Sequence, residues 1–359
     1  MNKQDRFSGC LFGGAVGDAL GFTVEFLNLS MIQNRFGKNG ITDLVLSKVT
    51  NKALISDDTQ MTLFTADGMI WAYLRCSERG IGSYAGSGTY QSYLRWLYTQ
   101  NGHITDKCWL EKQPHERENS IIKYDKSILE YKELFEKRAP GNTCISSLMS
   151  GTMGCIENPI NNSKGCGGVM RTAPVGLFLH HKPAYAFIIG AEIAAITHGH
   201  PSGYLSAGAL STIVAELVNG KSILESAESA MRILKTYESH EETLSAMENA
   251  LELAAGNETE INAIQTLGQG WVGEEALAIA LFCALRETDV KQALIASVNH
   301  DGDSDSTGAI CGNILGVAYG IDALPKDWVE NIELHDLILD MSDKLFALSE
   351  YAFNPQRKS

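Results

Sequence analysis

The sequence predicts an all-α protein, folded as a single compact multi-helix domain over residues 1–359. Apolar residues recur at helical spacing in several segments, which are 206–218, 222–236, 241–254, 274–286 and 290–298. The segment 185–196 is almost wholly apolar or small, as a buried helix would be. Alternation at period two is nearly absent, and Ile41–Ser47 is the only modest strand candidate. The length would permit two domains, but a single large helical domain also accommodates it.

The composition is that of a globular protein, with 44% apolar and 20% charged residues. A net charge of -14 disfavours broad binding to nucleic acid or to an anionic membrane, because phosphate contacts need clustered Lys and Arg. No segment reaches the roughly 18 uninterrupted apolar residues of a membrane span, and no long apolar stretch follows residues 1–6, so we do not expect a secretory signal. The eight cysteines include no C-x-x-C pair, which favours free thiols in a reducing compartment. We therefore expect a cytoplasmic protein.

The first helix is expected over Phe7–Gly21, where small residues would let a helix pack with its backbone close to a neighbour. The glycines do not follow the G-x-G-x-x-G spacing and no β-branched strand precedes them, which excludes a dinucleotide-binding fingerprint. Glu25 follows between Val24 and Phe26. An acid with apolar neighbours is either a partly buried functional carboxylate or an ordinary loop residue.

Paired acids stand at the start of the next predicted helix, in the run Ser56-Asp57-Asp58-Thr59. A single residue of this kind would be an ordinary N-cap, which accepts hydrogen bonds from free backbone N–H groups. Apolar residues at helical spacing follow over 60–71. The run therefore predicts a helix start. Capping would explain one of its two acids and leave the other without a role.

The segment 78–125 is rich in glycine and polar residues, and we expect loops around a helix near Thr89–Tyr98 that shape the rim of a substrate site. Lys123–Lys137 is expected to form an exposed amphipathic helix. It would end at 139–143, where Pro and Gly supply a break.

Clustered glycines occupy the run Lys164-Gly165-Cys166-Gly167-Gly168-Val169-Met170-Arg171. Glycines bring backbone N–H groups close to a ligand, and with a helix following they could hold a phosphate. No Walker Lys-Ser/Thr pair follows, so P-loop nucleotide hydrolysis is not supported. A loop of tight turns without a ligand is the alternative. Downstream, His198 and His200 have no Cys or third His at ligand spacing, which favours polar ligand contact or capping over zinc.

Three carboxylates and three hydroxyls lie together in the run Asp301-Gly302-Asp303-Ser304-Asp305-Ser306-Thr307. The apolar, glycine-rich run 308–316 follows, so the acids are expected at the N-terminal mouth of a buried helix. Capping accounts for one of them, but three crowded acids repel one another unless donors or a cation neutralise them. An all-oxygen ligand set suits Mg²⁺, Ca²⁺ or Mn²⁺.

Two known acidic motifs compete with this interpretation. An EF-hand is excluded, because its sixth and twelfth positions would be Ser306 and Gly312 rather than Gly and Glu. The D-x-D-x-T motif of aspartyl-phosphate phosphatases matches 303–307, but there it follows an early strand of a parallel sheet, so it stays a minor alternative. Since 56–59 has the same composition as this run, two facing clusters could hold two divalent ions.

Together these runs resemble the ADP-ribosylglycohydrolase family, and the resemblance spans almost the whole chain. The motifs that carry it, in chain order, are Gly17-Asp18-Ala19-Leu20-Gly21 with Glu25, Ser56-Asp57-Asp58-Thr59, Gly165-Cys166-Gly167-Gly168-Val169-Met170-Arg171, Thr197-His198 and Gly302-Asp303-Ser304-Asp305-Ser306. Several motifs in register are far more specific than any one of them. The resemblance implies an all-helical domain of the ADP-ribosylglycohydrolase type, with a cleft that binds ADP-ribose.

The resemblance also implies a role for each site residue. Two Mg²⁺ or Mn²⁺ ions would be held by Ser56, Asp57, Asp58, Asp303, Asp305 and Ser306. The catalytic acids would be Glu25, Asp57 and Asp58. Bound ADP-ribose would contact Gly165, Cys166, Gly167, Gly168, Met170 and His198, with its diphosphate at the glycine loop. Many members carry Thr where this chain has Ser56 and Ser306, and either hydroxyl can bind a metal.

The expected chemistry suits these residues. Cleavage of a ribosyl C1″ bond passes through an oxocarbenium-like state, which needs a nucleophilic water, a proton-handling group and charge that holds the sugar hydroxyls. Two ions can orient the ribose diol and activate the water, while Glu25 can accept the water's proton or protonate the leaving atom. We expect a metal-dependent hydrolase that acts on an ADP-ribosylated protein or a small ADP-ribose conjugate, with arginine side chains as acceptors. Serine-linked or O-acetyl-ADP-ribose, or a non-enzymatic ADP-ribose-binding or structural relative, are the alternatives.

Overall fold

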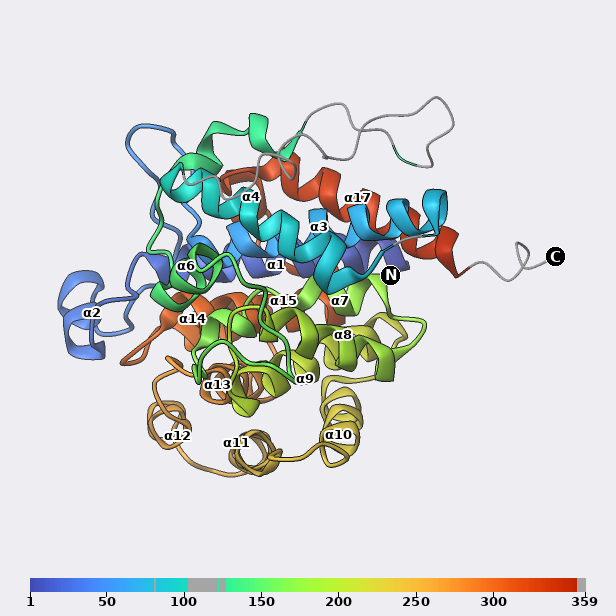
Figure 1. Ribbon diagram of the computed structural model, residues 1–359. Helices are drawn as coiled ribbons and strands as arrows, with labels where there is room; N and C mark the ends of the chain where they lie inside the picture. Colours follow the sequence, from blue (N-terminus) through green and yellow to red (C-terminus); the bar gives the residue numbers. More distant parts are fainter. Residues whose placement is uncertain (81, 103–121, 123–126, 354–359) are drawn as a thin grey trace.

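The structure is a computed structural model that describes every residue except 81, 103–121, 123–126 and 354–359 (Figure 1). Its described part is helical and contains no strand, only isolated bridges such as Leu46 with Ala53. The α-helices are α1 (Lys3–Phe22), α2 (Leu29–Phe36), α3 (Asp57–Arg79), α4 (Tyr90–Asn101), α6 (Asn142–Met149), α7 (Ala173–Phe178), α8 (Pro183–Ala195), α9 (Pro201–Val218), α10 (Ile223–Leu234), α11 (Glu241–Ala255), α12 (Glu260–Leu267), α13 (Gly273–Arg286), α14 (Val290–Val298), α15 (Ser304–Tyr319), α16 (Lys326–Asn331) and α17 (His335–Ala352). The predicted all-α class is confirmed.

Helices α1 and α15 lie at the centre of the molecule in direct backbone contact (Figure 1). Glycines spaced four residues apart along each helix share one face, because four residues are close to one helical turn. A Cβ placed on Gly13 would lie 2.2 Å from the carbonyl oxygen of Gly312, and one on Gly312 would lie 1.9 Å from that of Gly13. Only hydrogen fits at this contact, which confirms the predicted backbone-close packing of the first helix.

The glycine contact continues to the acidic mouth of α15. Near the end of α1, a Cβ on Gly17 would lie 2.0 Å from the Gly308 carbonyl oxygen, and one on Gly21 would lie 2.1 Å from that of Ser304. The end of α1, with the loop that follows it, is thereby held against the first turn of α15. This packing places the residues at the end of α1 next to the acids at the start of α15.

The other helices surround this central pair. Helices α3, α4 and α17 lie above it, while α8, α9 and α13 lie below it, with α10, α11 and α12 as an outer row (Figure 1). Contacts of α10 with α9, and of α11 and α12 with α13, place that row against the inner layer.

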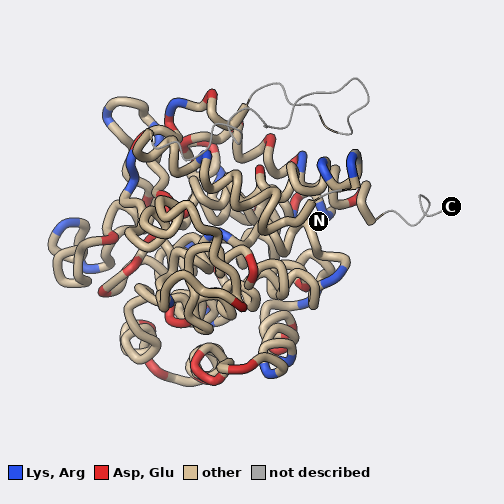
Figure 2. The backbone as a smooth tube through the Cα atoms, viewed as in Figure 1, with Lys and Arg blue, Asp and Glu red and all other residues tan. Residues whose placement is uncertain are grey.

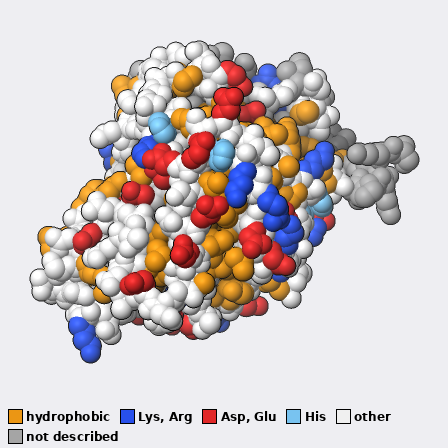
Figure 3. Space-filling model, turned by 90° about the horizontal axis from the view of Figure 1, so that it is seen from below, with side chains coloured by type: hydrophobic (Ala, Val, Ile, Leu, Met, Phe, Trp, Pro, Cys, Tyr) orange, Lys and Arg blue, Asp and Glu red, His pale blue; other side chains and the backbone are white. Residues whose placement is uncertain are grey.

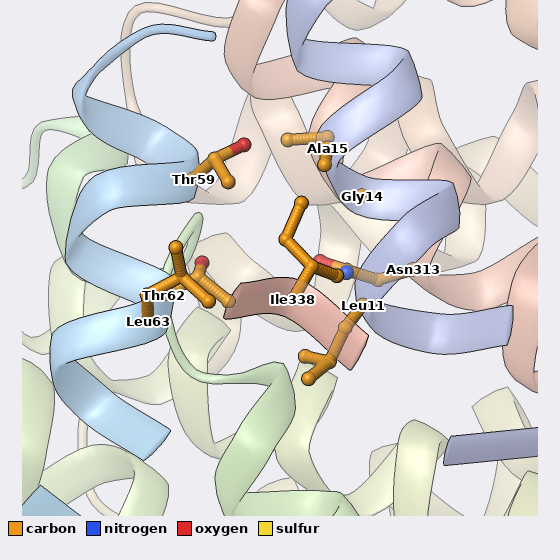
Figure 4. Close-up of a pocket in the computed structure, with 9 residues that line it drawn as sticks. Leu11, Gly14, Ala15, Thr59, Thr62, Leu63, Asn313 and Ile338 are labelled. Atoms are coloured by element: carbon orange, nitrogen blue, oxygen red, sulfur yellow. The ribbon is translucent and has the colours of Figure 1, made fainter. Parts of the chain in front are cut away.

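Four helices that carry or support the candidate site meet at a small cavity (Figure 4). Its lining comes from α1, α3, α15 and α17, and consists of Leu11, Gly14, Ala15, Thr59, Thr62, Leu63, Ala309, Asn313 and Ile338. It offers about 10 Å³ to the centre of a water-sized sphere, which is roughly the room of one water molecule. These helices are therefore packed with little free space between them.

The predicted exposed helix over Lys123–Lys137 is wrong in its described part. That part contains two short 3-10 turns, Ile128–Glu130 and Lys132–Phe135, joined by extended backbone at Tyr131. Ile128 and Leu134 are both buried, yet six residues in a helix are separated by about 240° around its axis. Breaking the helix lets both apolar side chains face the core.

The modest strand candidate over Ile41–Ser47 does not form a strand, since only the isolated bridge at Leu46 is present there. The Asn299 side chain accepts a hydrogen bond from the Ile41 N–H and donates one to its carbonyl oxygen, at 2.8 Å each. A side-chain amide thus takes the place that a neighbouring strand would fill. The helix predicted near Thr89–Tyr98 is confirmed as α4, and the expected loop at 103–121 lies outside the described residues.

Charge and thiols agree with the sequence analysis where the structure describes them. Lys and Arg are spread over the outer elements rather than gathered in one band (Figure 2). On the face seen from below, Asp and Glu outnumber Lys and Arg (Figure 3). The described cysteines are all free thiols, and four of them are buried, at Cys10, Cys144, Cys283 and Cys311. None of the described helices has the length and apolar character needed to cross a membrane.

We expect Gly312→Ala to destabilise the protein, because its methyl group would collide with the backbone of α1. Overpacking of this kind costs about 1–3 kcal/mol. Urea unfolding followed by circular dichroism should show a lower midpoint than wild type. Gly256→Ala is the matched control, since Gly256 has a φ of -81° and its nearest neighbours would lie 3.4 Å from the added Cβ. Equal midpoints for the two variants would contradict the backbone contact.

Candidate active site

The first wall of the site is the N-terminal turn of α3. Ser56 is the N-cap, and its side chain accepts a hydrogen bond from the Asp58 N–H at 3.1 Å. Asp57 accepts one from the Gly141 N–H at 3.3 Å. All three side chains are buried, so two carboxylates and a hydroxyl are held at one helix start with little access to bulk water.

The second wall is the N-terminal turn of α15. Asp303 is the N-cap, and its Oδ1 accepts a hydrogen bond from the Ser306 N–H at 3.2 Å. The same N–H is 3.0 Å from Asp305 Oδ1. Capping therefore engages Asp303, as the sequence analysis expected of one acid in this run. Asp301 turns elsewhere and accepts from the Leu29 N–H at 2.6 Å.

The two walls and Glu25 lie close enough for their charges to act on one another, and we call the group formed by Glu25, Asp57, Asp58, Asp303 and Asp305 the acid pocket. Burial, and then the charges of Asp58 and two other acids, raise the pKa of Asp305 well above its ordinary value. Burial, and then the charges of Asp57 and two other Asp residues, likewise raise the pKa of Asp58, and a hydrogen bond with Ser306 opposes this shift. Burial first, and then three nearby Asp charges, raise the pKa of Glu25 to about 9. The predicted acids are thus brought together.

This donor set fits hard divalent cations. Glu25 Oε2 and Asp58 Oδ1 are buried acceptors without a hydrogen-bond partner among the described residues. The charges that act on these carboxyls belong to other carboxyls, so they repel one another. A bound cation would supply the missing partners and cancel that repulsion. The oxygen ligands suit Mg²⁺ or Mn²⁺.

The spacing of the acids is also relevant. Within the described part of the chain, one set of three His, Cys, Asp or Glu groups has all its ligand atoms within 4.8 Å of one another, and it lies elsewhere, at His180, His181 and Glu350. The acids of the pocket are spread more widely over its two walls. Mg²⁺ usually keeps several waters and takes only one or two carboxylates, so it does not require a tighter set.

Asp18 is a supporting residue to which the sequence analysis assigned no role of its own. It is fully buried on α1, and both its carboxylate oxygens lie 3.0 Å from the Ser56 N–H. It also accepts from the Thr59 N–H at 3.0 Å and from the Thr59 hydroxyl. Burial raises the pKa of Asp18 to about 6, against the effect of these hydrogen bonds. Asp18 therefore ties the start of α3 to α1. In the sequence, the sign of this role was a single acid within a run of small apolar residues.

The glycine loop touches the second wall. The Cys166 thiol donates to Asp303 Oδ2 at 2.8 Å, and the Ser306 hydroxyl lies 3.8 Å from Met170 Sδ. A Cβ on Gly167 would lie 3.1 Å from His198 Cε1, so His198 packs against the same loop. Cys166 and Met170 thus contact the second wall, and His198 packs against the loop that carries them.

The loop amides are less available than the sequence predicts. The N–H groups of Gly165, Cys166 and Gly168 already bond to Ser163 Oγ at 3.3 Å, to the Trp271 carbonyl at 3.2 Å and to the Gly165 carbonyl at 3.5 Å. Close packing against Cys144 and His198 is by itself a sufficient reason for a glycine at 167. A cradle of several free amides is therefore not what this loop offers, although the loop still borders the pocket.

Arg171 holds the histidine side of the pocket. Its guanidinium is fully buried, donates to the Thr197 hydroxyl at 2.7 Å and lies 4.3 Å from the centre of the Tyr93 ring. The Thr197 hydroxyl lies 2.9 Å from His198 Nδ1. Burial and the Arg171 charge lower the pKa of His198 to about 3, so the imidazole is neutral. His200 is the N-cap of α9, and capping was one of the two roles that the sequence favoured for the histidines.

The fold and these motifs define the class of protein. The sequence pattern of the ADP-ribosylglycohydrolase family matches residues 1–354, and the chain belongs to this family of enzymes. The expected family and its enzymatic nature are thereby confirmed.

Two characterised relatives are similar along nearly the whole chain. The ADP-ribosyl-[dinitrogen reductase] glycohydrolase of Rhodospirillum rubrum is 24% identical, with 92% of this chain and 91% of the relative covered. The ADP-ribosylarginine hydrolase Tri1 of Pseudomonas putida is 22% identical, with 95% of this chain and 78% of the relative covered. A solved structure of an ADP-ribosylglycohydrolase-related protein complex has a TM-score of 0.66 at 21% identity, and covers 97% of this chain and 99% of that chain. At that identity the structural likeness shows the fold alone.

Stability of the metal-free protein should depend on Glu25 and fall as pH rises. The ordinary carboxyl pKa of 4.5 is raised to about 9 in the fold. Between these values the folded state binds more protons than the unfolded state, so the free energy of unfolding decreases with rising pH. Glu25→Gln cannot titrate, and should make the decline between about pH 5 and about pH 8 shallower without abolishing it, since other pocket acids remain.

Urea midpoints measured in chelator across that range test this expectation. Glu228→Gln, at an exposed position of α10, is the matched control and should keep the wild-type slope. A Glu25→Gln slope equal to the wild-type slope would show that the Glu25 carboxyl is not held protonated in the pocket.

Proposed function

We propose that this protein is a metal-dependent hydrolase that cleaves the ribosyl C1″ bond of ADP-ribosylated substrates, with arginine side chains of proteins as acceptors. The observation that carries the proposal is the pocket itself. Acids from α3 and α15 meet Glu25 there, and buried carboxylate oxygens of Glu25 and Asp58 lack partners among the described residues. The family supplies the reaction class.

The ligands for two Mg²⁺ or Mn²⁺ ions in this proposal are Ser56, Asp57, Asp58, Asp303, Asp305 and Ser306. Such ions, when bound, supply charge that orients the ribose hydroxyls and lowers the pKa of an attacking water. Asp18 keeps the first wall in place through Ser56 and Thr59. Cys166 does the same for Asp303 on the second wall, through its thiol hydrogen bond.

Glu25 is the proposed proton-transfer group. Its carboxyl is buried beside the proposed metal ligands, and burial is the first cause of its raised pKa. A carboxyl of this kind can deliver a proton to the leaving atom or take one from water. The neutral His198 and the 165–170 loop border the same space and would line the bound ADP-ribose.

Two exposed aromatic rings favour a guanidinium acceptor. Phe26 directly follows Glu25 and is 71% exposed, while Trp271 is 40% exposed. The rings stack with centroids 6.4 Å apart, and the Trp271 carbonyl accepts from the Cys166 N–H of the pocket loop. Planar guanidinium groups stack on aromatic faces, and a chain of charge -14 attracts cationic partners. The relative from Pseudomonas putida is named as an ADP-ribosylarginine hydrolase, and the relative from Rhodospirillum rubrum is named for an ADP-ribosylated protein.

The proposal predicts release of free ADP-ribose from an arginine-ADP-ribosylated protein in the presence of Mg²⁺, and not in chelator. Glu25→Gln should lower turnover by about 10²–10⁴-fold, the usual contribution of a placed proton-transfer group. Mass spectrometry of the released nucleotide measures both effects. Glu228→Gln again serves as control and should keep wild-type turnover.

Serine-ADP-ribosylated protein and O-acetyl-ADP-ribose should be tested in parallel. Either of them turning over tenfold faster than the arginine conjugate, a preference of about 1.4 kcal/mol in the transition state, would overturn the arginine assignment alone. No hydrolysis of any of the three conjugates with Mg²⁺ or Mn²⁺ would overturn the proposed function.

A further inference from the structure

A second group of metal-ligating side chains lies outside the acid pocket. His180 and His181 lie in the turn between α7 and α8, and Glu350 lies near the end of α17. Their ligand atoms all lie within 4.8 Å of one another, closer than any other set of three His, Cys, Asp or Glu groups in the described ranges. The end of α17 and this turn are on the same side of the molecule as the N-terminus (Figure 1).

The distances in this group suit a tetrahedral ion. Nε2 of His180 and Nε2 of His181 each lie 3.4 Å from Glu350 Oε1. Zinc binds imidazole nitrogen and carboxylate oxygen at about 2.0–2.2 Å, so two ligands on a tetrahedron are separated by about 3.3–3.5 Å. Each histidine therefore already has ligand spacing from the carboxylate, and the two imidazole rings lie side by side with centroids 3.8 Å apart.

His180 is held in the protonation state that a metal ligand needs. Its ring is fully buried, and Nδ1 lies 2.9 Å from the Leu177 carbonyl oxygen, which can only accept. Nδ1 therefore carries the proton, and Nε2, which lies 3.4 Å from Glu350 Oε1, carries the lone pair. Metal-bound histidines commonly donate their other ring N–H to a carbonyl in this way.

A cation already occupies this place in the structure. The Lys3 ammonium lies 3.1 Å from His180 Nε2 and 3.4 Å from Glu350 Oε1. Its side chain is 40% exposed, so it can turn into solvent when another cation binds. Phe7 packs against the His180 ring and Phe353 against the His181 ring, and Glu350 is 42% exposed on its side chain. The group thus has the charge and the access that a competing metal ion requires.

We propose that His180, His181 and Glu350 bind a zinc ion, with water as the fourth ligand, in competition with Lys3. Two imidazoles and a carboxylate match the nitrogen-rich sets that zinc prefers, whereas the acid pocket offers oxygen ligands that suit Mg²⁺ or Mn²⁺. Bound zinc joins the end of α17 to the turn after α7, where Ser349 already donates to the Phe178 carbonyl at 2.6 Å. The site is independent of the proposed hydrolase activity.

The test is the affinity of the full chain for Zn²⁺, measured by competition with a chromophoric chelator while excess Mg²⁺ is present to occupy the acid pocket. Removing one ligand by His181→Asn or Glu350→Gln should weaken binding at least about tenfold. Lys3→Met should tighten binding, because it removes the competing ammonium. His335→Asn is the matched control, since His335 is a partly exposed histidine at the other end of α17 and pairs with Asp336 at 3.0 Å.

Cobalt substitution provides a second readout that a change in folding cannot imitate. The Co²⁺ form of wild type should show the strong visible absorption of a four-coordinate ion, and Glu350→Gln should lose it while its metal-free urea midpoint stays unchanged. Equal Zn²⁺ affinity in wild type and both ligand variants would overturn the site, and so would weaker binding in Lys3→Met.

Discussion

Backbone contact between α1 and α15 is the constraint on which the rest of this molecule depends. Gly13 and Gly312 leave no room for a side chain between the two helices, and the same contact continues to Gly21 and Ser304. It sets the end of α1, and therefore Asp18 and Glu25, against the acidic first turn of α15. Asp18 then fixes the start of α3 through the Ser56 N–H. A pocket with acids on two walls follows from helix packing more than from any single loop.

The pocket that results is electrostatically unfavourable in the absence of a counter-ion. Burial and mutual repulsion raise the pKa values of Glu25, Asp58 and Asp305, and acceptor atoms of the first two remain without partners among the described residues. If the starts of α3 and α15 needed only an N-cap, one acid at each helix start would be enough. The surplus carboxylates destabilise the metal-free protein and are explained by a cation that they bind together.

Much of this could be predicted from the sequence, because local signals carry it. Helical periodicity identified most helices, and the acid-hydroxyl runs marked the two helix starts capped by Ser56 and Asp303. What the sequence could not predict depends on tertiary contacts. The break at Tyr131 arises because two apolar side chains on different helical faces must both reach the core. The glycine loop looked like an amide cradle, but most of its N–H groups are used within the fold.

The supporting role of Asp18 and the contact of His180 with Glu350 also could not be predicted from the sequence, since residues distant in the chain create them.

The most direct test of the central claim is a count of the ions held by the acid pocket. Elemental analysis after equilibration with Mn²⁺ should find two ions per chain in wild type. It should find fewer in Asp303→Asn, which keeps a good N-cap while losing the charge. Wild-type protein that binds no Mn²⁺ in the pocket, or an Asp303→Asn variant that binds as many ions as wild type, would contradict the account.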